Sequence, residues 1–378
     1  MANKNSNLGA AKTAKNDEFY TQYEDIEREM NAYLEYDENV FRGKTVLLPC
    51  DDPEWSNFTK YFAQNFERFG LKKLISTSYA PESKKIKAWE PTLFETEAPQ
   101  YDEDKSKTHG KLFILDSDTN GSGRIDVNDL RWEYLEGDGD FRSEEVTKLR
   151  DEADIVITNP PFSLFREFVA WLTESIKQFT IIGNQNAITY KEIFPLIKDN
   201  RMWLGKGFNG GAAHFISPYQ DIATAGDHKE GMIRVSGVMW FTNIEHGRRH
   251  QPLQLMTMAD NIKYSKHKEV KGIGYQKYEN YDAIDVPYTD AIPCDYEGIM
   301  GVPITFLDKF CPEQFEIIWR GGDLEWAESE CYFFTPPSEA RALKFKRIDR
   351  TWRVQNPYTV NTEDIHHTVY QRIFIRKK

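Results

Sequence analysis

Cysteine is scarce in this chain of 378 residues, and its four copies follow no CxxC spacing. They stand at Cys50, Cys294, Cys311 and Cys331. Such a scatter excludes a disulfide framework and a cysteine zinc site. The eight histidines form no HExxH motif. We therefore expect no metal in the functional site of this protein.

Long apolar runs are also missing. No stretch approaches the roughly 18 residues that a transmembrane helix needs. Residues 1–16 are small and polar and contain no apolar core of a signal peptide. We therefore expect a cytoplasmic protein that makes no use of a membrane, with residues 1–16 forming a flexible N-terminal arm.

Positive charge is in deficit, because 48 Lys and Arg residues face 60 Asp and Glu residues, for a net charge of −12. This balance excludes a protein that coats nucleic acid over its whole surface, but it allows a locally basic cleft. Residues 341–378 hold ten Lys and Arg against three acids, a net charge of +7. This basic tail is either a contact for a polyanion or a solvated terminus.

Apolar segments of strand and helix type alternate through the first 245 residues. We expect strands at 45–48, 73–79, 111–115, 154–158, 179–184 and 238–241, and helices at 24–36, 58–69 and 164–177. The β–α–β order at the start favours an α/β fold with a doubly wound sheet. Residues from about 80 to 135 are expected to form an insertion. The pattern weakens after residue 246, where we place a domain boundary.

The most informative segment is Asn159-Pro160-Pro161-Phe162, which directly follows an apolar strand. Ligands of open α/β sheets bind at the carboxyl ends of such strands. The Asn159 side-chain oxygen and the Pro160 carbonyl can both accept hydrogen bonds from one amino group, because two prolines stiffen the loop. Phe162 offers a flat face on which a base could stack. The simpler interpretation is a rigid turn, since Asn-Pro is a common turn dipeptide.

The segment from Asp154 to Phe162 resembles the catalytic motif of amino-methyltransferases that use S-adenosyl-L-methionine. Upstream, Phe19-Tyr20-Thr21 resembles the element before the first strand in adenine-N6 DNA methyltransferases. Asp140-Phe141 resembles the pair that holds the adenine of the cofactor in that group. Taken together, the chain is similar to the EcoRI-type adenine-specific DNA methyltransferases over most of residues 17–320.

This resemblance implies a site-specific transfer of a methyl group from S-adenosyl-L-methionine to N6 of a flipped-out adenine in double-stranded DNA. Residues 17–245 would form the catalytic domain with the methyltransferase type of doubly wound mixed sheet, and residues 246–378 a DNA-recognition region. A cognate restriction nuclease that forms no stable complex with the chain is a further expectation. The implied catalytic residues are Asn159, Pro160 and Phe162, and the implied cofactor-binding residues are Phe19, Tyr20, Thr21, Asp51, Asp52, Asp140 and Phe141.

Two departures from the pattern keep other functions open. The loop after the first strand, 51–58, contains no glycine, and no acid directly follows the strand at 73–79, although Glu82 lies a few residues on. Glycine normally allows the close backbone approach to a cofactor. One alternative is therefore an inactive DNA-binding module. Another is a methyltransferase that acts on RNA or on a protein glutamine, since an Asn-Pro-Pro site fits any planar amine.

A second motif, Asp118 to Asp129, matches the template of a calcium-binding EF-hand loop, with oxygen side chains at positions 1, 3 and 5 and glycine at position 6. No clear pair of helices flanks it. The alternative is a polar turn inside the insertion, and even a bound calcium ion would have a structural role.

Overall fold

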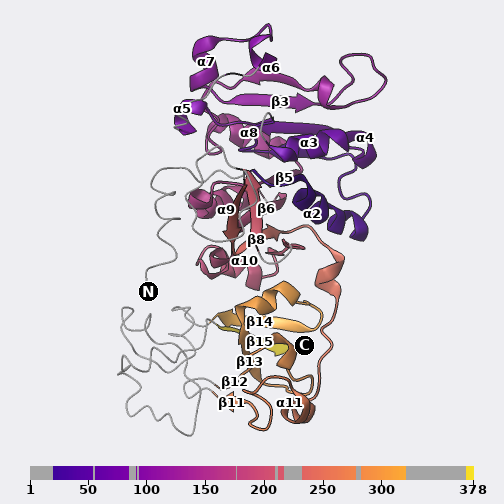
Figure 1. Ribbon diagram of the computed structural model, residues 1–378, viewed down its shortest axis with the longest axis vertical. Coiled ribbons are helices and arrows are strands. Elements are labelled where there is room, and N and C mark those ends of the chain that lie inside the picture. Colours follow the sequence, from indigo (N-terminus) through magenta and orange to yellow (C-terminus); the bar gives the residue numbers. More distant parts are fainter. Residues whose placement is uncertain are drawn as a thin grey trace. The chain divides into compact units, whose positions relative to one another are not determined.

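The computed structural model describes residues 20–53, 56–84, 91, 93–175, 177–208, 212–216, 232–277, 282–320 and 372–378. The chain divides into two compact units. Unit 1 comprises residues 1–193 and 202–247, and unit 2 comprises residues 194–201 and 248–378. Each unit contains a sheet of its own (Figure 1). Within the described part of the chain, no helix is long and apolar enough to cross a lipid bilayer.

An eight-stranded sheet forms the centre of unit 1. Its order is β4 (Arg131–Tyr134), β3 (Lys111–Leu115), β2 (Lys73–Thr77), β1 (Thr45–Leu48), β5 (Ile155–Thr158), β6 (Gln178–Asn184), β10 (Val238–Thr242) and β7 (Trp203–Leu204). The four strands β2, β1, β5 and β6 are parallel, and the strands outside them pair antiparallel. The prediction of a mixed α/β architecture is confirmed.

Helices pack on both faces of this sheet, because successive side chains of a strand point to opposite sides. The helices are α2 (Tyr23–Tyr36), α3 (Asn57–Gln64) and α4 (Phe66–Phe69) early in the chain, and α8 (Glu144–Glu152) and α9 (Phe165–Thr173) later. On β10, Trp240 packs edge-on against Phe58 of α3, whereas its neighbour Phe241 packs against Phe165 of α9. Thus α3 and α9 cover opposite faces.

The expected helix 58–69 is divided at Asn65 into α3 and α4, and it ends at Gly70 as its sequence indicates. Gly70 adopts a left-handed conformation with φ +64°, which glycine tolerates without strain. Residues 80–135 contribute more than a peripheral insertion. They supply the edge strand β4 and its neighbour β3, as well as the short helices α5 (Pro81–Lys84), α6 (Leu93–Thr96) and α7 (Glu103–Thr108). Unit 1 also contains an antiparallel pair of strands, β8 (Ala212–Ile216) and β9 (Met232–Ser236).

Unit 2 contains a five-stranded sheet that the sequence pattern did not reveal. Its order is β11 (Gln276–Lys277), β12 (Ala283–Asp285), β13 (Ile299–Pro303), β15 (Arg372–Lys377) and β14 (Phe315–Arg320), with the helices α10 (Phe194–Lys198) and α11 (Met258–Tyr264). Arg372 donates from Nε to Asp285 Oδ1 at 2.8 Å, and both side chains are buried. Arg376 pairs with Glu316. Both arginines belong to the basic tail, of which residues 341–371 lie outside the described residues.

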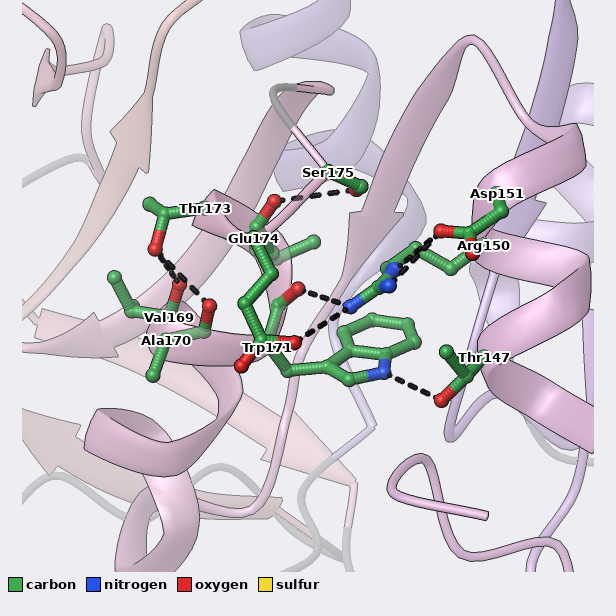
Figure 2. A network of polar contacts seen from close by, with 10 residues as sticks. Thr147, Arg150, Asp151, Val169, Ala170, Trp171, Thr173, Glu174 and Ser175 are labelled. Carbon is green, nitrogen blue, oxygen red and sulfur yellow. Dashed lines mark hydrogen bonds and ion pairs between the residues drawn. The ribbon is translucent and has the colours of Figure 1, made fainter. Parts of the chain in front are cut away.

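A buried arginine joins α8 to α9 in unit 1 (Figure 2). Arg150 is 5% exposed, and its guanidinium lies over the Trp171 ring at 5.0 Å. It donates to the Trp171 carbonyl oxygen at 2.5 Å and to Asp151 Oδ1 at 2.9 Å. The Trp171 indole N–H donates to Thr147 Oγ1 at 3.1 Å. This network fixes α9, the helix that begins directly after the Asn-Pro-Pro-Phe loop.

We predict that Arg150→Ala lowers the free energy of unfolding by about 2–4 kcal/mol, because it leaves a buried carbonyl without its donor and removes the packing on Trp171. Unfolding in urea measures this change. Arg68→Ala is the matched control, since Arg68 also lies over a ring, that of Phe69 at 5.5 Å, but is exposed. Its loss should cost no more than about 1 kcal/mol. Equal losses in the two variants would contradict the role of Arg150.

Candidate active site

The strands β1 and β5 are neighbours in the sheet, and the strands that follow them in the chain, β2 and β6, lie on opposite sides of this pair. After β1 the chain continues to β2 on one side, and it returns to β5 on the other side. Such a switch point is where open α/β sheets bind ligands, beyond the carboxyl ends of the strands. The two ends are tied together, because the Thr158 hydroxyl at the end of β5 donates to the Pro49 carbonyl oxygen after β1.

A cavity opens at this switch point. It is lined by Tyr20, Thr21, Cys50, Asp51, Ser56, Phe58, Asn159 and Pro161. The lining residues come from three separate segments, which precede α2, follow β1 and follow β5. Asn57 Nδ2 donates to the Thr21 carbonyl oxygen at 2.8 Å, which ties the first segment to the start of α3. The fold therefore assembles one polar cavity from parts that are distant in the sequence.

Asp51 is the most enclosed acid of the cavity, at 3% exposure. Its carboxylate accepts hydrogen bonds from the Ser56 hydroxyl and from the backbone N–H and hydroxyl of Thr59, the latter at 2.6 Å. The Ser76 hydroxyl on β2 donates to the Asp51 carbonyl oxygen at 2.5 Å. Burial raises the pKa of Asp51 to about 6, against the opposing effect of the bonds from Ser56 and Thr59.

The turn after β1 is made without glycine. Cys50 takes the left-handed conformation that glycine usually occupies, with φ 61°. This conformation costs a residue with a Cβ roughly 1–2 kcal/mol. The hydrogen bonds around Asp51 hold the turn, and Ser56 caps the N-terminus of α3 by accepting from the Phe58 N–H at 3.2 Å. The absence of glycine from 51–58 therefore does not prevent the turn.

The Asn-Pro-Pro-Phe loop lies at the end of β5, as its sequence indicates. Asn159 and Pro161 line the cavity. Pro161 precedes a single 3₁₀ turn, Phe162–Leu164, in which the Leu164 N–H donates to the Pro161 carbonyl oxygen at 2.9 Å. Phe162 is half-buried and packs against the hydrophobic core on the α2 and α3 side.

Asp140 and Phe141 lie after β4, beside the end of β2. Gly139 has φ +81°, and a Cβ there would collide with the Ser78 carbonyl oxygen, so only glycine permits this approach. Asp140 binds the Arg142 guanidinium through both carboxylate oxygens, at 2.9 and 2.6 Å. The Phe141 ring is 3% exposed and packs edge-on against Phe168 and Trp171 of α9. Neither residue lines the cavity described above.

The structure brings together Tyr20, Thr21, Asp51 and Asn159 from the sequence-predicted set. Pro160 is buried and Asp52 is half-buried, and neither residue lines the cavity. Phe19 lies outside the described residues. The lining residues that the sequence analysis missed are Cys50, Ser56, Phe58 and Pro161. Two of them carried a signal: Pro161 belongs to the Asn-Pro-Pro-Phe segment, and Ser56, a serine before a run of apolar helix residues, is a typical N-cap.

The Asp118–Asp129 loop forms a compact polar turn. Asp118 accepts from the backbone N–H groups of Gly121, Ser122 and Gly123, and Asp129 accepts from those of Thr119, Asn120 and Asp126. The bond from the Asp126 N–H leads the effects that lower the pKa of Asp129. Among the described residues, no group of three or more His, Cys, Asp or Glu side chains is arranged to hold a metal. Calcium binding by this loop stays an untested hypothesis.

A mixed sheet with a polar cavity at its switch point has the architecture of an α/β enzyme. The chain belongs to the family of the adenine-specific methyltransferase EcoRI, which it matches over residues 7–378. The predicted family is confirmed, and so is the prediction of an adenine-specific methyltransferase.

Three relatives are named Type II methyltransferases. The chain is 43% identical to M.EcoRI of Escherichia coli, over 83% of this chain and 89% of that protein. It is 35% identical to M.MpnI of Mycoplasma pneumoniae, over 82% and 83%, and 33% identical to M.MgeORF184P of Mycoplasma genitalium, over 82% and 84%. No solved structure gives a significant match to the chain.

We predict that Asp51 gives stability a distinct pH dependence. Its folded-state pKa of about 6 exceeds the ordinary 3.8, so the folded chain holds the proton more tightly than the unfolded chain does. The stabilisation that the protonated Asp51 gives to the folded chain is fully present at a pH below the pKa of the unfolded state. It is lost as the pH rises through the pKa of the folded state. The stability of the wild type relative to Asp51→Asn should therefore fall over this window, by about 1.4 kcal/mol per unit of pKa difference.

Urea unfolding of both proteins across this pH range measures the effect. Asp102→Asn is a control of opposite sign, because the Lys105 N–H leads the effects that lower the pKa of Asp102. For that pair, the relative stability of the wild type should rise with pH. A difference between the wild type and Asp51→Asn that does not change with pH would contradict the raised pKa of the buried Asp51.

Proposed function

We propose that the chain transfers a methyl group from S-adenosyl-L-methionine to N6 of adenine at a specific site in double-stranded DNA. The observation that carries this proposal is the position of Asn159 on the cavity at the switch point, beside Asp51. Membership of an adenine-specific methyltransferase family supports the reaction class. The doubly wound methyltransferase fold, with residues 17–245 as the catalytic domain and 246–378 as the DNA-recognition region, is part of the proposal.

The cavity suits the methionine end of this cofactor. Thr21 is buried, and its hydroxyl has no hydrogen-bond partner among the described residues, so the cavity offers a polar group ready for a ligand. Asp51 is an acid whose ionised form a cation would stabilise. When bound, S-adenosyl-L-methionine supplies an electrophilic methyl group on a positively charged sulfur. We infer that Tyr20, Thr21 and Asp51 hold its charged end.

Asp140 and Phe141 are proposed to hold the adenine of the cofactor. In this proposal the Asp140 carboxylate accepts a hydrogen bond from the N6 amino group of the cofactor, and Phe141 packs against the adenine ring of the cofactor. Because Phe141 is wedged against α9, the position of this subsite depends on the helix that Arg150 fixes. Arg142 joins the subsite to α9 as well, since it pairs with both Asp140 and Glu167.

Asn159 and Pro160 act on the target base. The N6 lone pair of adenine is delocalised into the ring, which makes the nitrogen a poor nucleophile. Two acceptors, the Asn159 side-chain oxygen and the Pro160 carbonyl oxygen, draw both N–H bonds out of the ring plane and return the lone pair to nitrogen. The residues do this through positioning and electrostatics. An adenine within a duplex is out of reach, so the base is flipped out, and Phe162 offers its new stacking partner.

Two alternatives are distinguished by the acceptor of the methyl group. In the first, an RNA base or a protein glutamine presents the same kind of planar amine to Asn159 and is methylated in place of DNA. In the second, the chain is an inactive DNA-binding module that methylates no acceptor and binds no cofactor. The Type II methyltransferases among the relatives favour DNA as the acceptor. A cognate restriction nuclease that acts without a stable complex stays part of the proposal.

We predict that Asn159→Ala lowers the turnover number for DNA methylation by roughly 10²–10³, because one of two acceptors in the transition state is lost. Affinity for the cofactor should change little, as calorimetric titration would show. Asn128→Ala is the matched control, since Asn128 is an exposed asparagine of the polar loop. Full activity in Asn159→Ala would refute its catalytic role.

We predict that substitutions in the two proposed subsites, at Asp140 for the cofactor and at Phe162 for the target base, impair different steps. Asp140→Asn should weaken cofactor binding, whereas Phe162→Ala should weaken handling of the flipped base by about 1–3 kcal/mol with cofactor affinity retained. Arg142→Gln is the control for Asp140, because it breaks the same ion pair but leaves the acceptor in place. Cofactor titration and DNA methylation kinetics separate these effects. An equal loss of cofactor affinity in the Asp140 and Phe162 variants would overturn the division into two subsites.

A further inference from the structure

Unit 2 carries a short basic stretch of exposed lysines in addition to the basic tail. Residues 261–277 hold five lysines and one acid, Glu269, in a chain whose net charge is −12. We call the lysines the lysine patch: Lys263, Lys266, Lys268, Lys271 and Lys277, all of them exposed. The segment runs from α11 through two glycine-containing turns to β11. The patch therefore concentrates positive charge on one short stretch of an acidic protein.

The backbone beneath the lysine patch is firmly held. Thr257 caps α11 by accepting from the Asp260 N–H at 3.1 Å, and Val270 is fully buried. Gly272 turns the chain with φ +73°, and its N–H donates to the Ile262 carbonyl oxygen at 2.8 Å. The Tyr275 hydroxyl donates to the Ala291 carbonyl oxygen at 2.6 Å. The lysines thus project from a scaffold with a fixed backbone.

Two acids near the lysine patch, Asp290 and Glu269, are already engaged. Asp290 binds both Lys266, at 2.8 Å, and His267, at 2.7 Å. Glu269 accepts from the Tyr288 hydroxyl at 3.1 Å, and the Tyr288 ring stacks on His267. The other four lysines of the patch form no ion pair with any residue that the structure describes. Four cations of the patch are therefore left without an ion-pair partner within the described part of the chain.

Tyr264 adds an exposed aromatic ring to the patch. It is 59% exposed, and Lys263 Nζ lies 4.8 Å from its ring centre. Lysines on flexible stems bind phosphates as point charges, without reading the base sequence. A chain of net negative charge must bind a polyanion through such a local concentration of cations.

We propose that the lysine patch binds the phosphate backbone of duplex DNA and so positions the substrate of the proposed methyl transfer. The inference rests on the proposed function for its ligand. Each phosphate that a lysine neutralises contributes about −0.9 to the slope of log affinity against log salt concentration. Removal of the lysines should therefore change the salt dependence of DNA affinity if they contact phosphates, but not if the patch is only a solvated surface.

The test compares two triple variants that remove the same number of charges. The first replaces Lys263, Lys268 and Lys271 by Gln. The matched control replaces Lys72, Lys105 and Lys148 by Gln, which are exposed lysines of unit 1. Binding of a fluorescent duplex is measured at several salt concentrations, together with the calorimetric affinity for S-adenosyl-L-methionine. We expect the patch variant to flatten the salt slope by about two to three, the control by less than about one, and neither to change cofactor affinity.

Equal slopes in the two variants would overturn the inference. The patch would also lose its assignment if its replacement altered salt-dependent self-association in sedimentation instead, because the acidic surface of a second copy would then be its partner. Methylation of the same duplex by the wild type separates this inference from the proposed function. Transfer with equal slopes refutes the patch alone, whereas a patch-dependent slope without any transfer refutes the methyltransferase proposal and leaves the patch as a DNA contact.

Discussion

The buried carboxyl group of Asp51 connects the parts on which the candidate site depends. It accepts from Ser56 and Thr59 at the start of α3, while the Asp51 backbone carbonyl accepts from Ser76 on β2. These bonds hold a turn in which Cys50 occupies a left-handed conformation. The Asn57 side chain, one residue after Ser56, then secures the Tyr20-Thr21 segment. If this carboxyl group is lost, the end of β1, the start of α3 and the first wall of the cavity lose their common anchor.

The same anchor explains how an adenine methyltransferase family member can lack the glycine loop after its first strand. Glycine usually serves there because it adopts left-handed conformations at little cost. Here a cysteine takes that conformation, and side-chain hydrogen bonds to Asp51 offset the strain. The cavity accordingly gains the Cys50 and Ser56 side chains, which a glycine loop would not provide.

The sequence predicted the central strands and the position of Asn159 because short apolar runs that end in polar or proline residues identify buried parallel strands and their carboxyl ends. It also predicted Tyr20, Thr21 and Asp51 as neighbours, through resemblance rather than through spacing. It could not predict Cys50, since a positive φ in a residue other than glycine leaves no mark in the sequence. The sheet of unit 2 was not predicted, because it pairs strands that are far apart in the sequence. In the pairing of β13 with β15, Met300 lies opposite Ile375. The lysine patch was not predicted, because its five lysines carry a smaller net charge than the basic tail and are spread over a helix, a turn and a strand.

We propose that Asn159 and the residues of the Asp51 cavity together catalyse methyl transfer to adenine in duplex DNA. The most direct measurement offers the purified protein unmethylated duplex DNA, RNA and a glutamine-containing protein with S-adenosyl-L-methionine, and locates the product by single-molecule sequencing of the DNA. We expect N6-methyladenine in the duplex within one recurring sequence context. Methyl groups found in RNA or protein but not in DNA, or no transfer to any acceptor, would contradict it.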